Sequence, residues 1–237
     1  MSAPAQRGGA VAIRSAALSI GVAVGAYAIG FGAVAVAAGL TPLQAQALSA
    51  LMFTGASQFA FVGVVATGGG LVAAAATAWL LGLRNGLYAL HLATVLHPPG
   101  RPGVRLRGWR RAGAAHLTID ESTAMAMSHE DDPGQASPAF WTTGLSVFVL
   151  WNLGTLLGAV GAASLADPTT LGLDAAIPAG FLALLWPRLV DGAAWALAVA
   201  SGGLALLLAP ALRPGIPVLA GAGLAVAGAL WLTRPRA

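Results

Sequence analysis

The sequence contains no cysteine and no lysine, and charged residues of either sign make up only 8% of its 237 residues. The lack of cysteine excludes a disulfide framework, a thiolate nucleophile and a thiolate metal site. A soluble domain carries roughly 25% charged residues, so the low charge content and the 57% of hydrophobic residues exclude that class. We therefore expect a single integral membrane domain over residues 1–237.

The charges that are present indicate orientation rather than a binding partner. The four histidines are too scattered for metal-binding spacing, and no cofactor is expected. Arginine at the N-terminus (Arg7, Arg14) and in the loop of residues 98–111 marks both as cytoplasmic by the positive-inside rule, and gives no sign of a nucleic-acid partner. The loop arginines are Arg101, Arg105, Arg107, Arg110 and Arg111.

Long apolar runs dominate the rest of the sequence. Residues 15–83 contain no charged side chain, and one transmembrane helix needs only about 20 residues. The first run is too long for the apolar part of a signal peptide, so we expect a retained first span. The chain divides into apolar segments that predict an all-α polytopic membrane protein with about 6–8 transmembrane segments: residues 10–39, 43–67, 71–96, 112–128, 133–166, 174–188, 192–212 and 214–233.

The second segment, residues 43–67, is expected to be broken or re-entrant. Three full crossings before the arginine-rich loop would place that loop and the N-terminus on opposite sides, although both carry arginine. The conflict disappears if one segment enters and leaves on the same side, and the second segment has a polar, glycine-containing centre at Gly55 to Gln58. An N-terminus outside the cytoplasm is the alternative.

Residues 112–128 predict a short helix that carries His116, Asp120 and Glu121 among apolar residues. As a span, this helix would place two carboxylates in the membrane at a cost of about 2.5–3.5 kcal/mol each, so they would face the protein interior. As an amphipathic surface helix, it would leave them in water. We favour the buried placement, and we expect the arginine-free polar turn of residues 129–134 on the extracytoplasmic side.

The two halves of the chain show a faint symmetry. Gly32 precedes Gly55 by 23 residues and Gly154 precedes Pro178 by 24, so each half has a glycine-bearing helix followed by an interrupted segment. Paired interrupted segments are typical of inverted-repeat transporters with a site near mid-membrane. The predicted repeats cover residues 10–128 and 138–233, each with one broken or re-entrant helix. Chance similarity in an Ala/Gly-rich sequence is the alternative.

Five short motifs follow one another along the chain: residues 55–59 (GASQF), 83–88 (LRNGLY), 117–121 (LTIDE), 151–155 (WNLGT, with Gly158) and 178–181 (PAGF). In content and order they resemble the AzlC family of branched-chain amino-acid exporters. One departure is Asn85, where the family often carries histidine.

The resemblance implies a transporter subunit of the bacterial cytoplasmic membrane. It would export valine, leucine and isoleucine together with a small AzlD-type membrane subunit. The zwitterionic substrate needs donors for its carboxylate, acceptors for its ammonium and a dry pocket for its tail. The candidates for substrate binding are Gly55, Ala56, Ser57, Gln58, Arg84, Asn85 and Asn152. Those for ammonium binding or proton coupling are Asp120 and Glu121, and those for the pocket wall are Phe59, Phe61, Trp151 and Phe181.

Two other classes of function stay open. An intramembrane hydrolase could use Ser57 with His91, but the sequence lacks the glycine-flanked serine turn of such enzymes. A passive channel or a non-transporting scaffold subunit would explain dependence on a partner. The sequence has no resemblance to an ATP-binding loop, which favours a secondary mechanism driven by the proton gradient.

Overall fold

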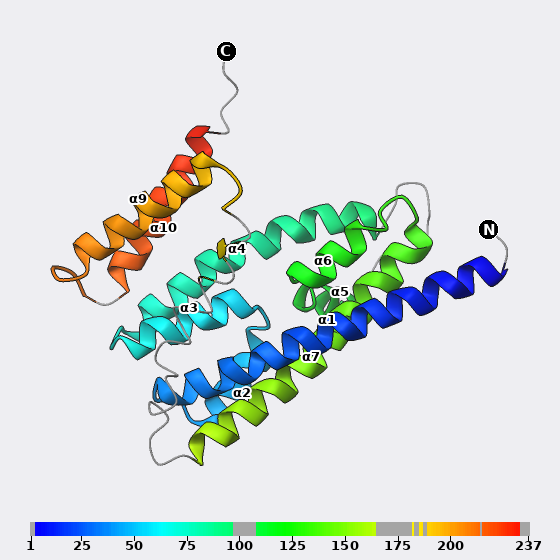
Figure 1. The fold of residues 1–237 in the computed structure, drawn as a ribbon, viewed down its shortest axis with the longest axis horizontal. Helices are drawn as coiled ribbons and strands as arrows, with labels where there is room; N and C mark the ends of the chain where they lie inside the picture. The colour runs from blue at the N-terminus through cyan, green and yellow to red at the C-terminus, as the bar shows by residue number, and fades with distance from the viewer. Residues whose placement is uncertain are drawn as a thin grey trace.

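The structure is a computed structural model that describes residues 3–96, 108–164, 182, 185, 186, 189–213 and 215–232 (Figure 1). These residues form nine helices and no strand, so the all-α prediction is confirmed for the described part of the chain. The helices are α1 (Ala3–Ala37), α2 (Pro42–Leu51), α3 (Gly55–Ala66), α4 (Leu71–Val95), α5 (Gly108–His116), α6 (Asp120–Met127), α7 (Pro133–Ala163), α9 (Gly192–Leu208) and α10 (Ile216–Leu232).

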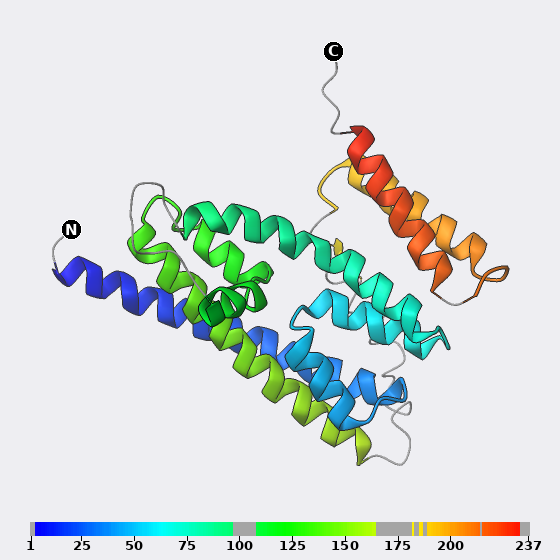
Figure 2. The same ribbon diagram turned by 180° about the vertical axis from the view of Figure 1, so that it is seen from behind.

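Helices α1 and α7 pack side by side along most of their length (Figures 1 and 2). A Cβ added to Gly154 would meet the carbonyl oxygen of Gly25, and one added to Gly32 would meet that of Thr155. Glycine lets the two backbones approach this closely. Because the contacting residue numbers rise together along both helices, α1 and α7 run parallel.

The predicted break in the second apolar segment is confirmed. Helix α2 begins at a capped turn, in which Thr41 Oγ1 accepts a 3.2 Å hydrogen bond from the backbone N–H of Gln44 and proline occupies the first turn. The break covers residues 52–54, and Gly55 to Gln58 form the first turn of α3 rather than the break itself.

The two arms α2 and α3 form a re-entrant hairpin. They have 10 and 12 residues, or about 15 and 18 Å at 1.5 Å per residue, so each reaches about half of a 30 Å hydrocarbon core. The chain turns back at the break, since Leu40 before α2 lines the same surface groove as Val65 and Leu71 after the turn (Figure 2). The hairpin therefore starts and ends at the end of the molecule where α1 ends.

The single helix predicted over residues 112–128 is wrong, because the chain breaks at residues 117–119 between α5 and α6. Ser122 explains the break. Its hydroxyl donates to the carbonyl of Leu117 at 2.5 Å and accepts from the N–H of Ile119 at 3.1 Å, so a side chain replaces the backbone bonds of a continuous helix. These arms have 9 and 8 residues, and they form a second short pair.

The polar turn after α6 lies at the same end of the molecule as the start of α1. Nε2 of His91, near the end of α4, is 3.4 Å from a carboxylate oxygen of Glu130, and a Cβ on Gly9 of α1 would meet the side chain of Gln135 at 2.8 Å. The prediction that residues 129–134 lie on the side opposite the N-terminus is therefore wrong. It assumed that residues 112–128 cross the membrane, whereas α5 and α6 enter and return.

The tips of the two hairpins meet beside the middle of α7. The ring of Phe53, in the first break, lies 5.7 Å from that of His116 and 5.0 Å from that of Phe148. Next to them, Leu117 of the second break lies against Gly144, one turn before Phe148 on α7. A Cβ added to Gly144 would be 3.1 Å from the Cβ of Leu117. Since Phe148 is the central residue of α7, both breaks lie at the mid-depth of the bundle.

The order of a long helix and two short arms thus occurs twice, as α1–α2–α3 and as α4–α5–α6, and the two units enter from opposite ends (Figure 1). The predicted repeats of residues 10–128 and 138–233 would instead make α1 and α7 the equivalent helices of the two repeats. These two helices are parallel, which is not the arrangement that an inverted repeat with those bounds requires. The interrupted segment near Pro178 lies outside the described residues, so the longer repeat stays a prediction.

Helices α9 and α10 pack on each other and contact the rest of the described chain near Gly215, whose added Cβ would lie 2.8 Å from Ala73 Cβ. Among the described residues, two stretches are long and apolar enough to cross a membrane, Gly9–Ala37 and Gly134–Ala163. Helix α4 is 25 residues long and has Arg84 near its centre. Most of the arginine-rich loop lies outside the described residues, and Arg110 and Arg111 at the start of α5 are exposed.

Candidate substrate site

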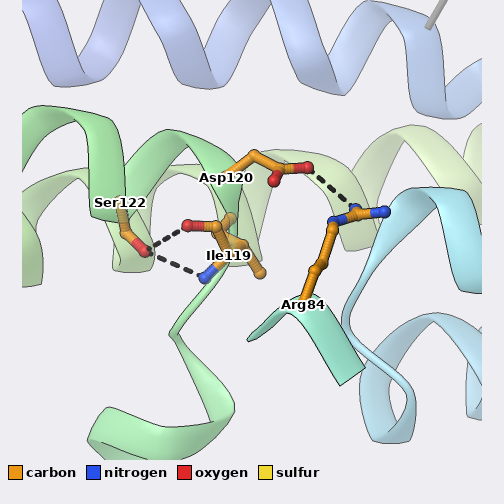
Figure 3. A network of polar contacts seen from close by, with 4 residues as sticks. All are labelled: Arg84, Ile119, Asp120 and Ser122. Carbon is orange, nitrogen blue, oxygen red and sulfur yellow. Dashed lines mark hydrogen bonds and ion pairs between the residues drawn. The ribbon is translucent and has the colours of Figure 1, made fainter. Parts of the chain in front are cut away.

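An ion pair lies at mid-depth between α4 and the start of α6 (Figure 3). Nη2 of Arg84 donates to Oδ2 of Asp120 at 2.8 Å, and the two side chains keep 28% and 34% of their surface exposed. Charges at this depth are expensive unless they are paired or face a polar space. The structure therefore brings together two of the residues that the sequence predicted for substrate and ammonium binding.

Several buried polar atoms on α3, α4 and α6 make no hydrogen bond within the described part of the chain. They are Arg84 Nε, Asp120 Oδ1, Asn85 Oδ1, Ser57 Oγ and Thr123 Oγ1. An unsatisfied buried polar atom costs about 1–3 kcal/mol, and such atoms in a native protein call for an explanation. A polar solute bound among them would satisfy both donors and acceptors.

The first turn of α6 carries both acidic candidates, Asp120 and Glu121, and both are partly buried. Carboxylates in the first turn are favoured by the helix dipole. Asp120 turns toward α4 in Figure 3 and bonds to Arg84.

Gln58 lies elsewhere and is fully engaged by the protein. Its Nε2 donates to the carbonyl of Ser49 at 3.2 Å, and its Oε1 accepts from Nε1 of Trp151 at 2.9 Å. Gly55 packs on the same indole, since an added Cβ would lie 3.0 Å from its ring. These two candidates, predicted for substrate binding, instead hold the first hairpin against α7 in this structure.

Asn152 also binds protein rather than the ion-pair region. Its Oδ1 accepts a 2.9 Å hydrogen bond from Gln46 on α2, and its Nδ2 donates to the carbonyl of Phe148. One turn further, Ser49 and Thr155 are hydrogen-bonded at 3.1 Å. Asn152 therefore belongs to a polar interface between α2 and α7, not to the group around Arg84.

The aromatic candidates divide in the same way. Phe59 and Trp151 are buried and pack with Phe31 of α1, whose ring centroid lies 5.3 and 6.0 Å from theirs. Phe61 lines a separate apolar groove of about 740 Å³ on the surface of α2 and α3. Phe181 lies outside the described residues.

The hydroxyl and imidazole of the alternative hydrolase are not in contact. Ser57 lies against Gly82 of α4, with its Oγ 3.6 Å from an added Cβ there. His91 lies nine residues further along, or about 13 Å at 1.5 Å per residue, and faces Glu130.

Sequence reasoning missed the aromatic contact of Phe53, His116 and Phe148. No local pattern joins these residues, because each comes from a different helix or break. It also missed Ser122, although the motif of residues 117–121 stops one position before it. The available signal for the second break was Ser122 itself, four residues after Thr118, because a serine hydroxyl can bond to nearby backbone groups in place of a helix hydrogen bond.

Two short helix pairs that meet at mid-depth, beside charged and unsatisfied polar atoms, define a helical bundle with polar groups at its centre. A comparison with known families then places it. The sequence profile of the family described as AzlC protein matches residues 19–165, from within α1 to just past α7, and the chain belongs to the AzlC family. Four of the five motifs fall within this range.

Membership of this family makes the chain a membrane protein with a function related to branched-chain amino-acid transport. No curated protein and no solved structure is significantly similar to the chain.

Proposed function

We propose that this chain is a secondary transporter subunit that exports branched-chain amino acids across the bacterial cytoplasmic membrane. It works with a small membrane subunit of the AzlD type, and the proton gradient drives it. The observation that supports this proposal is the Arg84–Asp120 ion pair, partly accessible and placed where two re-entrant pairs meet.

The ion pair has the chemistry of the substrate it would bind. A free amino acid carries one carboxylate and one ammonium group, so it can bind beside the Arg84–Asp120 pair with no change of net charge. Charge-assisted hydrogen bonds of this kind contribute about 1.5–3 kcal/mol each. A neutral zwitterion can therefore enter at mid-depth without leaving a charge unpaired.

Proton coupling needs a carboxyl group that can gain and lose a proton near the substrate. Asp120 and Glu121 adjoin on one turn, and within the described part of the chain one arginine, Arg84, pairs with Asp120. Two carboxylates with one cation favour the binding of one further positive charge. An ammonium group and a proton would compete for that place, which is a direct route to exchange of the two.

Export from cells loaded with a valine-containing dipeptide tests the function. The chain, the small subunit and both together are expressed in a strain without its own exporters. We expect valine export from the pair, and a loss of at least about tenfold in Arg84→Gln and Asp120→Asn, because each removes a charge-assisted hydrogen bond. The matched control is the His91–Glu130 contact, with His91→Gln and Glu130→Gln expected to export like the parent.

Two outcomes would count against the proposal. Parental export by Arg84→Gln and Asp120→Asn proteins that insert normally would remove the ion pair from the substrate path. Export by the small subunit alone would make this chain a scaffold.

A further inference from the structure

The half-helices α3 and α6 begin alike but present opposite chemistry. Thr54 is the N-cap of α3, and Ile119 holds the same position in α6. The next three residues are Gly-Ala-Ser in α3 and Asp-Glu-Ser in α6. The first turn of α6 is therefore filled with carboxylates, whereas that of α3 has no acidic residue and no capping side chain.

The serine at the third position shows the difference most clearly. Ser122 is fully used, since its hydroxyl bonds to the backbone of Leu117 and to the backbone of Ile119, as Figure 3 shows. Ser57 occupies the equivalent position, is 1% exposed, and its Oγ makes no hydrogen bond within the described part of the chain. A buried hydroxyl beside backbone N–H groups that lack intrahelical partners provides donors for an anion.

Asn85 lies between the two helix starts. Around α4, successive residues are about 100° apart. Gly82 faces Ser57 and Arg84 bonds to Asp120, so the side chain of Asn85, which falls between them in angle, points to the gap between α3 and α6. Its Oδ1 also makes no hydrogen bond within the described residues.

We infer that the two half-helices bind the opposite ends of one amino acid: the first turn of α3, with Ser57, binds the carboxylate, and the first turn of α6 binds the ammonium through Asp120 and Glu121. This inference rests on the proposed function. In this inference Arg84 holds the Asp120 side chain in position. Ser57, and not Arg84, is then the residue that selects for a carboxylate. Asn85 accepts from the ammonium between the two ends.

Three ligands separate the two ends: leucine, leucinamide, which has no carboxylate, and 4-methylpentanoate, which has no ammonium. Calorimetric titrations on the full-length protein compare the parent with two variants. Ser57→Asp places a carboxylate at the bare helix start, where the helix dipole favours it, and thermal unfolding in detergent checks that this variant is folded. Asp120→Asn removes a charge from the other end. Ser122→Ala is the control for a serine that only holds the backbone.

For Ser57→Asp, we expect the affinity for leucine and 4-methylpentanoate to fall at least about tenfold, while the affinity for leucinamide stays or rises, because the new negative charge repels only the carboxylate. For Asp120→Asn, we expect the reverse pattern, with leucine and leucinamide weakened and 4-methylpentanoate retained. Ser122→Ala should change all three ligands alike.

The inference is overturned if a folded Ser57→Asp protein loses leucine and leucinamide to the same degree, or binds leucine as the parent does. The proposed function would then still stand, because the parent binds leucine. If the parent binds neither leucine nor leucinamide, the proposed function fails. In that case, a parent that binds 4-methylpentanoate and a Ser57→Asp variant that does not would still support the anion site at α3. A parent that binds none of the three ligands overturns both.

Discussion

Nε1 of Trp151 donates a 2.9 Å hydrogen bond to Oε1 of Gln58, and neither side chain is more than 4% exposed. The same amide reaches the last carbonyls of α2 through its Nε2. One glutamine thus joins the end of α2, the start of α3 and the centre of α7. In other proteins, the carbonyls at such a helix break can hold a cation, and here an amide N–H takes that place.

Replacing Gln58 by leucine should therefore destabilise the protein before it affects the substrate. The change removes the hydrogen bonds of the Trp151 indole N–H and of the Ser49 carbonyl to Gln58, at about 1–3 kcal/mol for each. We expect a lower melting temperature in detergent for Gln58→Leu, and a smaller decrease for Asn152→Leu, whose bond to Gln46 is partly exposed.

An unchanged melting temperature together with weakened leucine binding would contradict this role. In that case Gln58 would contact the substrate directly, as its position in the polar motif of the sequence predicted.

The parallel contact of α1 and α7 should tolerate no side chain at its closest points. A Cβ on Gly154 would overlap the carbonyl of Gly25, whereas one on Gly161 of the same helix has nothing within 4 Å. We expect Gly154→Val to lower stability by about 1–3 kcal/mol or more, by overpacking, and Gly161→Val to melt near the parent. Equal stability of the two variants, measured by thermal unfolding in detergent, would show that the helices do not touch there.

Much of the fold could be predicted from the sequence because a membrane restricts the length, polarity and charge of the segments that enter it. Charge content, apolar length and arginine placement predicted an all-α membrane protein, and the conflict between two arginine clusters located the first re-entrant pair. The second pair was missed, since Ala-rich residues 112–128 favour a helix and only the Ser122 hydroxyl reverses this locally. That single error also placed residues 129–134 at the wrong end.

The candidate site was predictable in part, for a similar reason. Arg84, Asp120 and Ser57 were predicted because a polar group stands out in apolar surroundings. In the structure Arg84 bonds to Asp120, and Ser57 lies against Gly82 on the helix that carries Arg84. The same argument chose Gln58 and Asn152, whose partners, Trp151 and Gln46, come from distant segments. Sequence alone cannot separate a polar residue that binds substrate from one that bonds to its neighbours.

The two hairpins make a specific prediction about sidedness, which the absence of native cysteine makes easy to measure. Gly70, after α3, and Glu130, after α6, lie at opposite ends of the bundle and are both exposed. We expect an impermeant thiol reagent to label Gly70→Cys in intact spheroplasts, and to label Glu130→Cys only after permeabilisation. Labelling of both from outside would show that one hairpin is a full crossing. The reversed pattern would place the N-terminus outside.

The contact between Phe53 and His116 is the place where the two re-entrant pairs touch, with ring centroids 5.7 Å apart. A transporter that passes its substrate between these tips must separate them during each cycle. Cysteines at both positions can be joined by a short thiol-to-thiol cross-linker that contains a reducible disulfide, and we expect the cross-linked protein to stop exporting valine and to recover after reduction.

The matched control joins α1 to α7 instead, through Gly9→Cys with Gln135→Cys, where the Gly9 position lies 2.8 Å from the Gln135 side chain. These helices pack along their length and should not need to part, so the control cross-link should leave export intact. Export at the parental rate from fully cross-linked Phe53→Cys/His116→Cys protein would mean that the tips never separate. The path would then have to run between α4 and α6, past the exposed side of the Arg84–Asp120 pair.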